Sequence, residues 1–301
     1  MPTAVALRPR SFSELFDAAF LLVREHFRPL ATLSAMVAIP AIVLNAANVA
    51  LFGPLTAAGT PADPLAMLPT LPLTLVSTCW YFVGVAAMLD TASRGYLGEP
   101  VDPAASLRRA VRRAGALVGA HLLAYLAAAL VLGVAMGVVA VAGVAVAAGL
   151  RVPGLRPPAS TVVAVAIAAT GTAAALAAAG LVLARYVNMS AVLMLEESGG
   201  AVDALRRSSA LSAGHRWRIV GLFAILAAVS LAFSLTALGI GSLAGNAYVS
   251  GVVATLFTIP LYPLVAGVLV ALYYDLRIRK EGFDIARAAR ELGPADPAPA
   301  A

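Results

Sequence analysis

The feature that most constrains the fold is the length of the uninterrupted apolar runs. Ala114 to Leu150 contains no Asp, Glu, Lys or Arg, and His121 is the one side chain there that can become charged near neutral pH. An α-helix rises about 1.5 Å per residue, so about 20 apolar residues cross the hydrocarbon core of a bilayer. This run is longer than one crossing, which predicts a tilted helix or a helix that extends into the following loop.

Five further runs of the same character bring the expected number of crossings to six. Hydrophobic residues make up 61% of the chain and charged residues only 12%, whereas a soluble domain carries about 25% charged residues. The chain therefore has too few polar groups to cover a water-facing surface, and we expect an all-α, polytopic integral membrane protein with six transmembrane helices. The five further runs are Leu30–Leu51, Leu73–Leu89, Thr161–Ala184, Ile219–Ile240 and Ala247–Tyr273.

A short amphipathic segment precedes each pair of apolar runs. Leu15, Leu107 and Leu205 occupy like places in these segments, spaced by a little under one hundred residues. Ser11 and Glu14 form a capping box, which marks the start of the first segment. We expect three two-helix repeats with cytoplasmic amphipathic helices in one membrane domain, followed by a disordered tail. The boundaries are 1–292 for the domain, about 11–100, 101–199 and 200–285 for the repeats, and 293–301 for the tail.

The first amphipathic segment, Ser11 to Phe27, carries an aromatic stripe. Two arrangements suit such a stripe, and the sequence leaves both open. The helix can lie at the boundary between headgroups and acyl chains, or it can pack against the protein's own helices. The stripe consists of Phe12, Leu15, Phe16, Ala19, Phe20, Val23 and Phe27.

Small residues are frequent in the apolar runs. Three pairs of glycines fit the motif with which membrane helices approach one another closely. In a chain with 25 glycines such matches occur by chance, so they predict tight helix packing and no particular dimer. The pairs are Gly115 and Gly119, Gly133 and Gly137, and Gly241 and Gly245.

The distribution of positive charge predicts the orientation. Of the 21 Lys and Arg residues, only Arg151 and Arg156 fall in the three loops that join the two runs of a pair. By the positive-inside rule, both termini are then cytoplasmic in a multi-pass protein of the cell membrane. The net charge of +6 lies beside apolar runs, so the lipid bilayer with its anionic headgroups is the expected partner and nucleic acid is not.

Two sets of residues are candidates for function. Basic and aromatic residues near the ends of the runs are candidates for contact with anionic lipid or a protein partner. They are Arg108, Arg109, Arg112, Arg113, Arg206, Arg207, Trp217, Arg277 and Arg279. Polar residues within or beside the runs are candidates for a ligand path, because such groups are costly in lipid. They are Asn45, Asn48, Asp90, His121, Arg185, Asn188 and Asn246.

Structural hydrogen bonding is the favoured interpretation of the polar set, and a site for a transported ligand is the alternative. A pair between Asp90 and Arg185, joining even-numbered spans, is one arrangement that the sequence allows. Snorkelling toward the boundary lowers the cost of both charges. A single histidine such as His121 is more often satisfied by its neighbours than a ligand.

The motifs of several enzyme classes are missing from the sequence. It contains no Walker loop, no HExxH and no GxSxG. Three histidines do not suffice for a metal site, and the single Cys79 cannot form a disulfide within the chain. We therefore expect no catalytic residue, no metal and no cofactor.

Two terminal motifs carry a resemblance to a known family. The opening is Arg8-Pro-Arg-Ser-Phe-Ser-Glu-Leu-Phe-Asp-Ala-Ala-Phe, and the closing motif is Leu272-Tyr-Tyr-Asp-Leu-Arg-Ile-Arg-Lys-Glu-Gly-Phe-Asp. The chain resembles, from about residue 8 to 290, a bacterial family named for the membrane domain of glycerophosphoryl diester phosphodiesterase. The resemblance implies membrane location and about six helices. It implies no activity, because the H-R-G opening of the catalytic domain has no counterpart: His215 and Arg216 precede Trp217.

The sequence thus predicts a non-enzymatic membrane component that anchors or organises a partner, or contacts lipid. The alternative is a transporter or lipid-handling protein with a path between the repeats. A continuous polar cavity that reaches Asn45, Asn48, His121 and Asn246 would favour the alternative, and a dry packed interior would favour the first.

Overall fold

The described chain is helical throughout and contains six helices long and apolar enough to cross a membrane. The computed structural model describes residues 8–56, 68–147, 159–196, 199–243 and 245–291. The prediction of an all-helical chain with six candidate crossings is confirmed for these residues. The long helices are α2 (Phe27–Thr56), α3 (Leu71–Tyr96), α5 (Ala114–Ala147), α6 (Ala159–Tyr186), α9 (Arg216–Leu243) and α10 (Ala247–Glu281). The short ones are α1 (Phe12–Glu25), η1 (Leu68–Thr70), α4 (Pro103–Arg112), α7 (Met189–Leu195), α8 (Ala201–Ser212) and α11 (Phe283–Glu291).

Several helices extend beyond their expected bounds. Helix α10 continues past Tyr273 to Glu281 and includes Pro260 and Pro263 in its interior. It ends at Gly282, whose φ of +59° is left-handed and favours glycine, and whose N–H donates to the Ile278 carbonyl at 3.1 Å. Polar residues therefore continue the helix out of the apolar region. The tail expected at 293–301 lies outside the described residues, as do most residues of the loops after α2 and α5.

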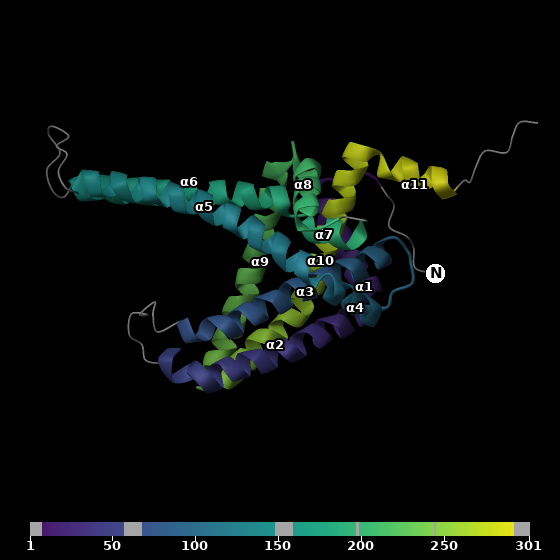
Figure 1. Cartoon of the computed structure of the whole chain (residues 1–301), viewed down its shortest axis with the longest axis horizontal. Helices are drawn as coiled ribbons and strands as arrows, with labels where there is room; N and C mark the ends of the chain where they lie inside the picture. Colours follow the sequence, from purple (N-terminus) through teal and green to yellow (C-terminus); the bar gives the residue numbers. More distant parts are fainter. Residues whose placement is uncertain (1–7, 57–67, 148–158, 197–198, 244, 292–301) are drawn as a thin grey trace, which may run out of the picture.

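The long helices form two arms that diverge from a common end (Figure 1). In one arm, α10 packs against α2, α3 and α9, and α2 also packs against α3. In the other, α5 and α6 form a hairpin that packs chiefly on itself. The short helices α1, α4, α7, α8 and α11 lie at the end where the arms meet (Figure 1). The region that positions the candidate residues is therefore this shared end.

The buried core lies at the shared end. Its largest fully buried side chains include Tyr96 and Met88 of α3, Tyr273 of α10 and Leu193 of α7. Trp80 Nε1 donates to the carbonyl of Val37 at 2.9 Å and ties α3 to α2. Apolar packing thus joins helices that are far apart in the chain, since α1, α3, α7 and α10 all contribute to one cluster.

Helix α1 packs against the protein's own helices, which is one of the two arrangements that the sequence left open, through part of its stripe. Leu15 and Ala19 are fully buried, and a Cβ built on Gly267 of α10 would stand 3.2 Å from the Ala19 Cβ. A side chain at this position would make a contact tighter than most, so glycine favours the close approach of α1 to α10. Phe20 and Phe27 remain 59% and 57% exposed. One part of the aromatic stripe is therefore a packing face, and the other part stays uncovered.

The glycine pairs do not all mark close packing. A Cβ built on Gly133 or Gly137 would meet no heavy atom within 4 Å, so the expectation of tight packing is wrong at this pair. Close approaches occur instead at single glycines. A Cβ on Gly171 of α6 would stand 2.4 Å from a Val139 methyl of α5. The motif alone does not say which face of a helix meets a neighbour.

Candidate functional site

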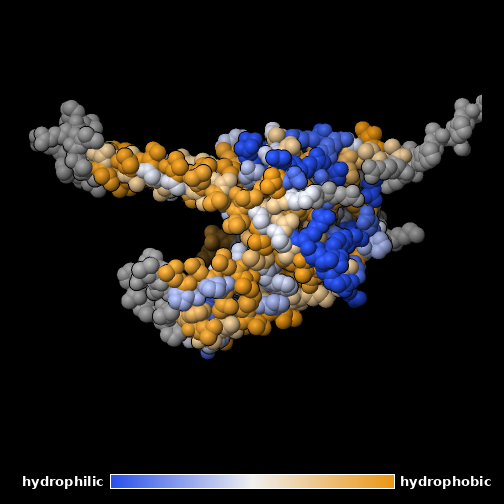
Figure 2. Space-filling model, viewed as in Figure 1, coloured by the Kyte–Doolittle hydropathy of each residue, from blue (hydrophilic) through white to orange (hydrophobic). Residues whose placement is uncertain are grey.

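Polar side chains gather at the end where the two arms meet (Figure 2). The arms themselves present apolar surfaces, and the hydrophilic residues form a band at one end of the molecule (Figure 2). Three clusters of charged residues organise this polar end. We name them by their central carboxylates, Asp275, Asp90 and Glu196, which lie on α10, α3 and the turn after α7.

The Asp275 cluster joins the start of the chain to its end. Asp275 is 1% exposed, and its Oδ2 lies 2.9 Å from Arg218 Nη1 of α9 and 3.0 Å from Arg279 Nε. Its Oδ1 accepts the backbone N–H of Arg10 at 2.7 Å. Arg218 and Arg279 both donate to the Arg10 carbonyl. One buried carboxylate thus fixes the segment before α1 against α9 and α10.

The aromatic residues beside this cluster extend it toward α3. Arg10 Nε donates to the Tyr96 hydroxyl at 3.2 Å. The Tyr96 ring stacks on Tyr274 with centroids 5.3 Å apart, and the Tyr274 hydroxyl is 2.7 Å from Ser93 Oγ. Residues of the opening and closing motifs therefore contact one another in space. Sequence reasoning chose Arg279 but missed Asp275, Arg10 and Arg218, although the two motifs contained the first two.

The Asp90 cluster fastens α4 to α3. Asp90 is 2% exposed and accepts hydrogen bonds from Ser106 Oγ and, at 2.9 Å, from Arg109 Nη1. Arg94 Nε lies 3.5 Å from the same carboxylate. The pair between Asp90 and Arg185, which the sequence allowed, is therefore not the arrangement that the structure has. The short helix after α3 returns to it and places Ser106 and Arg109 on Asp90 first.

Arg185 and Asn188 bind the serine-bearing face of α8 instead. Arg185 reaches Ser209 Oγ at 3.4 Å, and the Asn188 N–H donates to Ser208 Oγ at 3.1 Å. The Asn188 side-chain amide also donates to Ser212 Oγ at 3.4 Å. These contacts fill the break between α6 and α7. They agree with the structural interpretation of both residues.

The Glu196 cluster joins α8 to α10. Arg207 Nε lies 2.9 Å from Glu196 Oε2, and its Nη1 pairs with Glu281 Oε1. These hydrogen bonds, to Glu281 and then to Glu196, raise the pKa of Arg207 further above its ordinary value. The Tyr273 hydroxyl donates to Glu196 Oε1 at 2.8 Å. Arg277 pairs with Glu281 at 3.0 Å and lies over the Phe283 ring, so α11 is tied to the same cluster.

The expected contact residues separate into two groups. Five of them bind the protein's own groups: Arg109, Arg113, Arg207, Arg277 and Arg279. Arg113 does so through the Leu193 carbonyl. The other four remain exposed: Arg108, Arg112, Arg206 and Trp217. Trp217 is 70% exposed, which suits an aromatic anchor at the boundary of a bilayer.

The polar residues within the spans contact different elements. The His121 ring stacks on Phe82 of α3 at 3.9 Å, its Nδ1 donates to the Leu117 carbonyl at 2.8 Å, and its Nε2 faces Ser190 Oγ at 3.5 Å. Asn246 accepts the Tyr248 N–H at 2.8 Å as the N-cap of α10. Their hydrogen bonds have structural roles, and the two residues belong to opposite ends of the arms.

The two remaining asparagines lie on α2. A Cβ built on Gly251 of α10 would stand 2.1 Å from Asn45 Nδ2, so the Asn45 amide packs into the space above this glycine. Asn48 is half-buried. Asn45 contacts α10, whereas His121 contacts α3 and α7, so these two residues have different neighbours.

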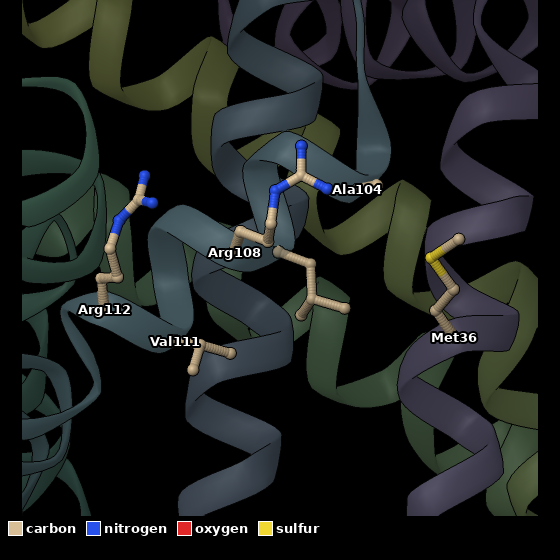
Figure 3. A pocket seen from close by; sticks show the side chains of 6 residues that line it. Met36, Ala104, Arg108, Val111 and Arg112 are labelled. Carbon is tan, nitrogen blue, oxygen red and sulfur yellow. The ribbon is translucent and has the colours of Figure 1, made fainter.

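A groove opens at the polar end between α2 and α4 (Figure 3). Its volume is about 510 Å³, and it is lined by Met36 of α2 and by five residues of α4. In Figure 3 the guanidinium groups of Arg108 and Arg112 project to the same side of α4, and Met36 faces α4 from α2. The five residues of α4 are Ala104, Leu107, Arg108, Val111 and Arg112.

Metal-ligating side chains do not gather in the described part of the chain, where no three His, Cys, Asp or Glu residues form a group that could hold an ion. Chemically, the polar end offers guanidinium groups above apolar surface. Comparison of the chain with protein-family models, with curated proteins and with solved structures found no match.

Proposed function

We propose that this protein is a non-enzymatic, multi-pass membrane anchor whose polar end contacts anionic headgroups and organises a partner at the membrane surface. The observation that carries this proposal is a contrast between two sets of charged residues at the polar end. Asp275, Asp90 and Glu196 are all bonded within the protein, whereas Arg108 and Arg112 are exposed beside apolar surface. The clusters hold the helices, and the exposed arginines remain for contacts outside the chain.

The polar end is the cytoplasmic side in this proposal. The first described residues and α11 both lie at this end, which supports a common side for the two termini (Figure 1). Excess of Lys and Arg marks the cytoplasmic side of membrane proteins. A reporter that is active only outside the cytoplasm will work when inserted near Ala62 and fail when fused to the C-terminus. The reverse pattern would overturn this orientation.

We also propose that the chain is built from three repeats. The order of one short helix and two long helices occurs three times, as α1–α3, α4–α6 and α8–α10. Duplication of such a unit is common in membrane proteins. The repeats would have diverged in their packing, since α5 and α6 form a separate arm. The resemblance to the family of phosphodiesterase membrane domains stays a prediction that rests on the two terminal motifs, which contact one another at Arg10 and Asp275.

Native mass spectrometry of protein extracted gently from its own membrane tests the proposal. The expected result is a stoichiometric protein partner that dissociates when Arg206 and Trp217 are replaced by alanine. Arg24 of α1 and Arg28 of α2, both exposed, serve as control positions. A small solute retained without any partner would overturn the anchor and favour the transport alternative. His121 donates to the Leu117 carbonyl and Asn246 caps α10, which supports a structural role for both residues.

A further inference from the structure

The groove between α2 and α4 exists because α4 uses its opposite face to hold α3. Ser106 and Arg109 bind Asp90, and Ala110 is fully buried beside them. Positions 104, 108 and 112 follow one another at helical spacing on another face, with Leu107 and Val111 next to them. That face is turned toward α2, where Met36 forms the far wall.

The two arginines of the groove, Arg108 and Arg112, have few carboxylates of the protein near their guanidinium groups. The Arg108 side chain is 66% exposed, and its nearest carboxylate is Asp102 at 3.9 Å. Arg112 is exposed and forms no ion pair with any residue that the structure describes. Two adjacent guanidinium groups present planar sets of donors that match the oxygens of a phosphate. The rim of the groove is thus complementary to a phosphate anion.

The remainder of the groove is apolar and continues into the membrane. Met36 lies nine residues after Phe27, the first residue of α2, which is about 14 Å along the helix axis. Ile39 and Val43 follow on the same side of α2 at helical spacing, and both are exposed. Cations at the rim of the groove, with the apolar residues Met36, Ile39 and Val43 below them, match an amphiphile. A free phosphate or a polar peptide would leave these apolar residues without a contact.

We propose that this groove binds one anionic phospholipid, with its phosphate between Arg108 and Arg112 and an acyl chain against Met36, Leu107 and Val111. The volume of about 510 Å³ falls within the range of small-ligand sites, roughly 300 to 1,000 Å³. The site deepens the proposed contact with headgroups and rests on that proposed function. It adds a defined stoichiometry and a preference for anionic over zwitterionic lipid.

The test measures lipid binding by the purified protein in detergent. Phosphatidylglycerol and phosphatidylcholine, which carry the same acyl chains, are added in turn, and bound lipid is counted by native mass spectrometry. We expect one phosphatidylglycerol to bind preferentially. The double variant Arg108→Gln, Arg112→Gln weakens this binding at least about tenfold, because it removes two charge-assisted contacts. Met36→Trp weakens it as well, without a change of charge, because the indole fills the groove.

A matched control has the same change of net charge elsewhere. Arg24→Gln with Arg28→Gln replaces two exposed arginines of α1 and α2 that do not line the groove, and it keeps the binding. Equal losses in both double variants would overturn the site and leave general attraction to headgroups standing. Competition by inorganic phosphate as strong as that by phosphatidylglycerol, with no effect of Met36→Trp, would overturn the lipid as ligand. Retention of the protein partner in all variants would separate this site from the anchor function.

Discussion

The two arms of the molecule are stabilised by different means. In the hairpin of α5 and α6, none of the residues in the most apolar stretch of α5 is buried (0%). In the other arm, 33% of the residues in the corresponding stretch of α3 are buried. The hairpin is held by small residues, with Ala128, Ala175 and Ala179 buried at its contact. The arm around α10 continues into the polar end, where carboxylates are buried among arginines.

The two arms differ because one packs in lipid and the other continues into a region that contains charged groups. Lipid is as apolar as a leucine side chain, so close van der Waals packing is what holds the hairpin together. At the polar end the helices leave the hydrocarbon, and burial there removes charges from water. Such charges have to be paired, which fixes the directions of Asp275 and Asp90. We therefore expect the stability of the hairpin to depend on side-chain volume, and the stability of the polar end to depend on side-chain charge.

We expect the largest loss of stability from a substitution at the polar end. Asp275→Ala leaves the guanidinium groups of Arg218 and Arg279 without their shared carboxylate, which destabilises the fold by about 3 to 5 kcal/mol. The free energy of unfolding in detergent micelles measures this loss. Glu99→Ala is the control, because Glu99 is 44% exposed and 4.0 Å from Arg94, and it costs less than about 1 kcal/mol. Equal losses in the two variants would remove the distinction between buried and exposed pairs.

A smaller effect is expected from added volume in the hairpin. Gly171→Leu places a Cβ 2.4 Å from a Val139 methyl and destabilises the contact by about 1 to 3 kcal/mol. Hydrogen exchange should then become faster in α5 and α6 and stay unchanged in α10. Gly133→Leu is the same change at a position without a heavy atom within 4 Å, and its exchange should match that of the wild type. Faster exchange at the polar end would contradict the independence of the two arms.

The third prediction concerns the start of α4, the short helix between α3 and α5. Asp102 caps α4 by accepting the N–H groups of Ala104 and Ala105 at 3.0 and 3.1 Å. Asp102→Ala removes the cap and lowers the free energy of unfolding by about 1 kcal/mol. Asp102→Asn keeps an acceptor and should restore most of the loss. A loss of the same size in both variants would show that charge, and not capping, is what Asp102 supplies.

The smallest effect depends on pH. In the capping box of α1, hydrogen bonds from the Ser11 backbone and side chain, together with Arg8, lower the pKa of Glu14 from 4.5 to about 2. A depressed pKa contributes stability above pH 4.5 that disappears as the pH falls toward 2. The difference in unfolding free energy between the wild type and Glu14→Gln should therefore vanish over this interval. A difference that stays constant down to about pH 2 would contradict the capping box as the source of this stability.

Much of the architecture could be predicted from the sequence because it depends on local patterns. Helix α1 begins directly after Ser11 of the expected capping box, and α5 begins at Ala114, where the expected run begins. These predictions succeed because capping and hydropathy act over neighbouring residues. The contacts of Asp90 and Arg185 could not be predicted, because each residue has several cations or acceptors within reach of a span end.

The sequence by itself determined the six long apolar helices that the described residues form, with charged residues confined to the helix ends. The physical reason is that lipid excludes charge from any long helix, whatever its neighbours. Only the tertiary structure decided which arginines are used internally and which remain exposed. That choice depends on the rotation of each helix about its axis, which turns Arg109 toward Asp90 and leaves Arg108 and Arg112 beside the groove. Adjacent residues on one helix thus differ in role because they point to different neighbours.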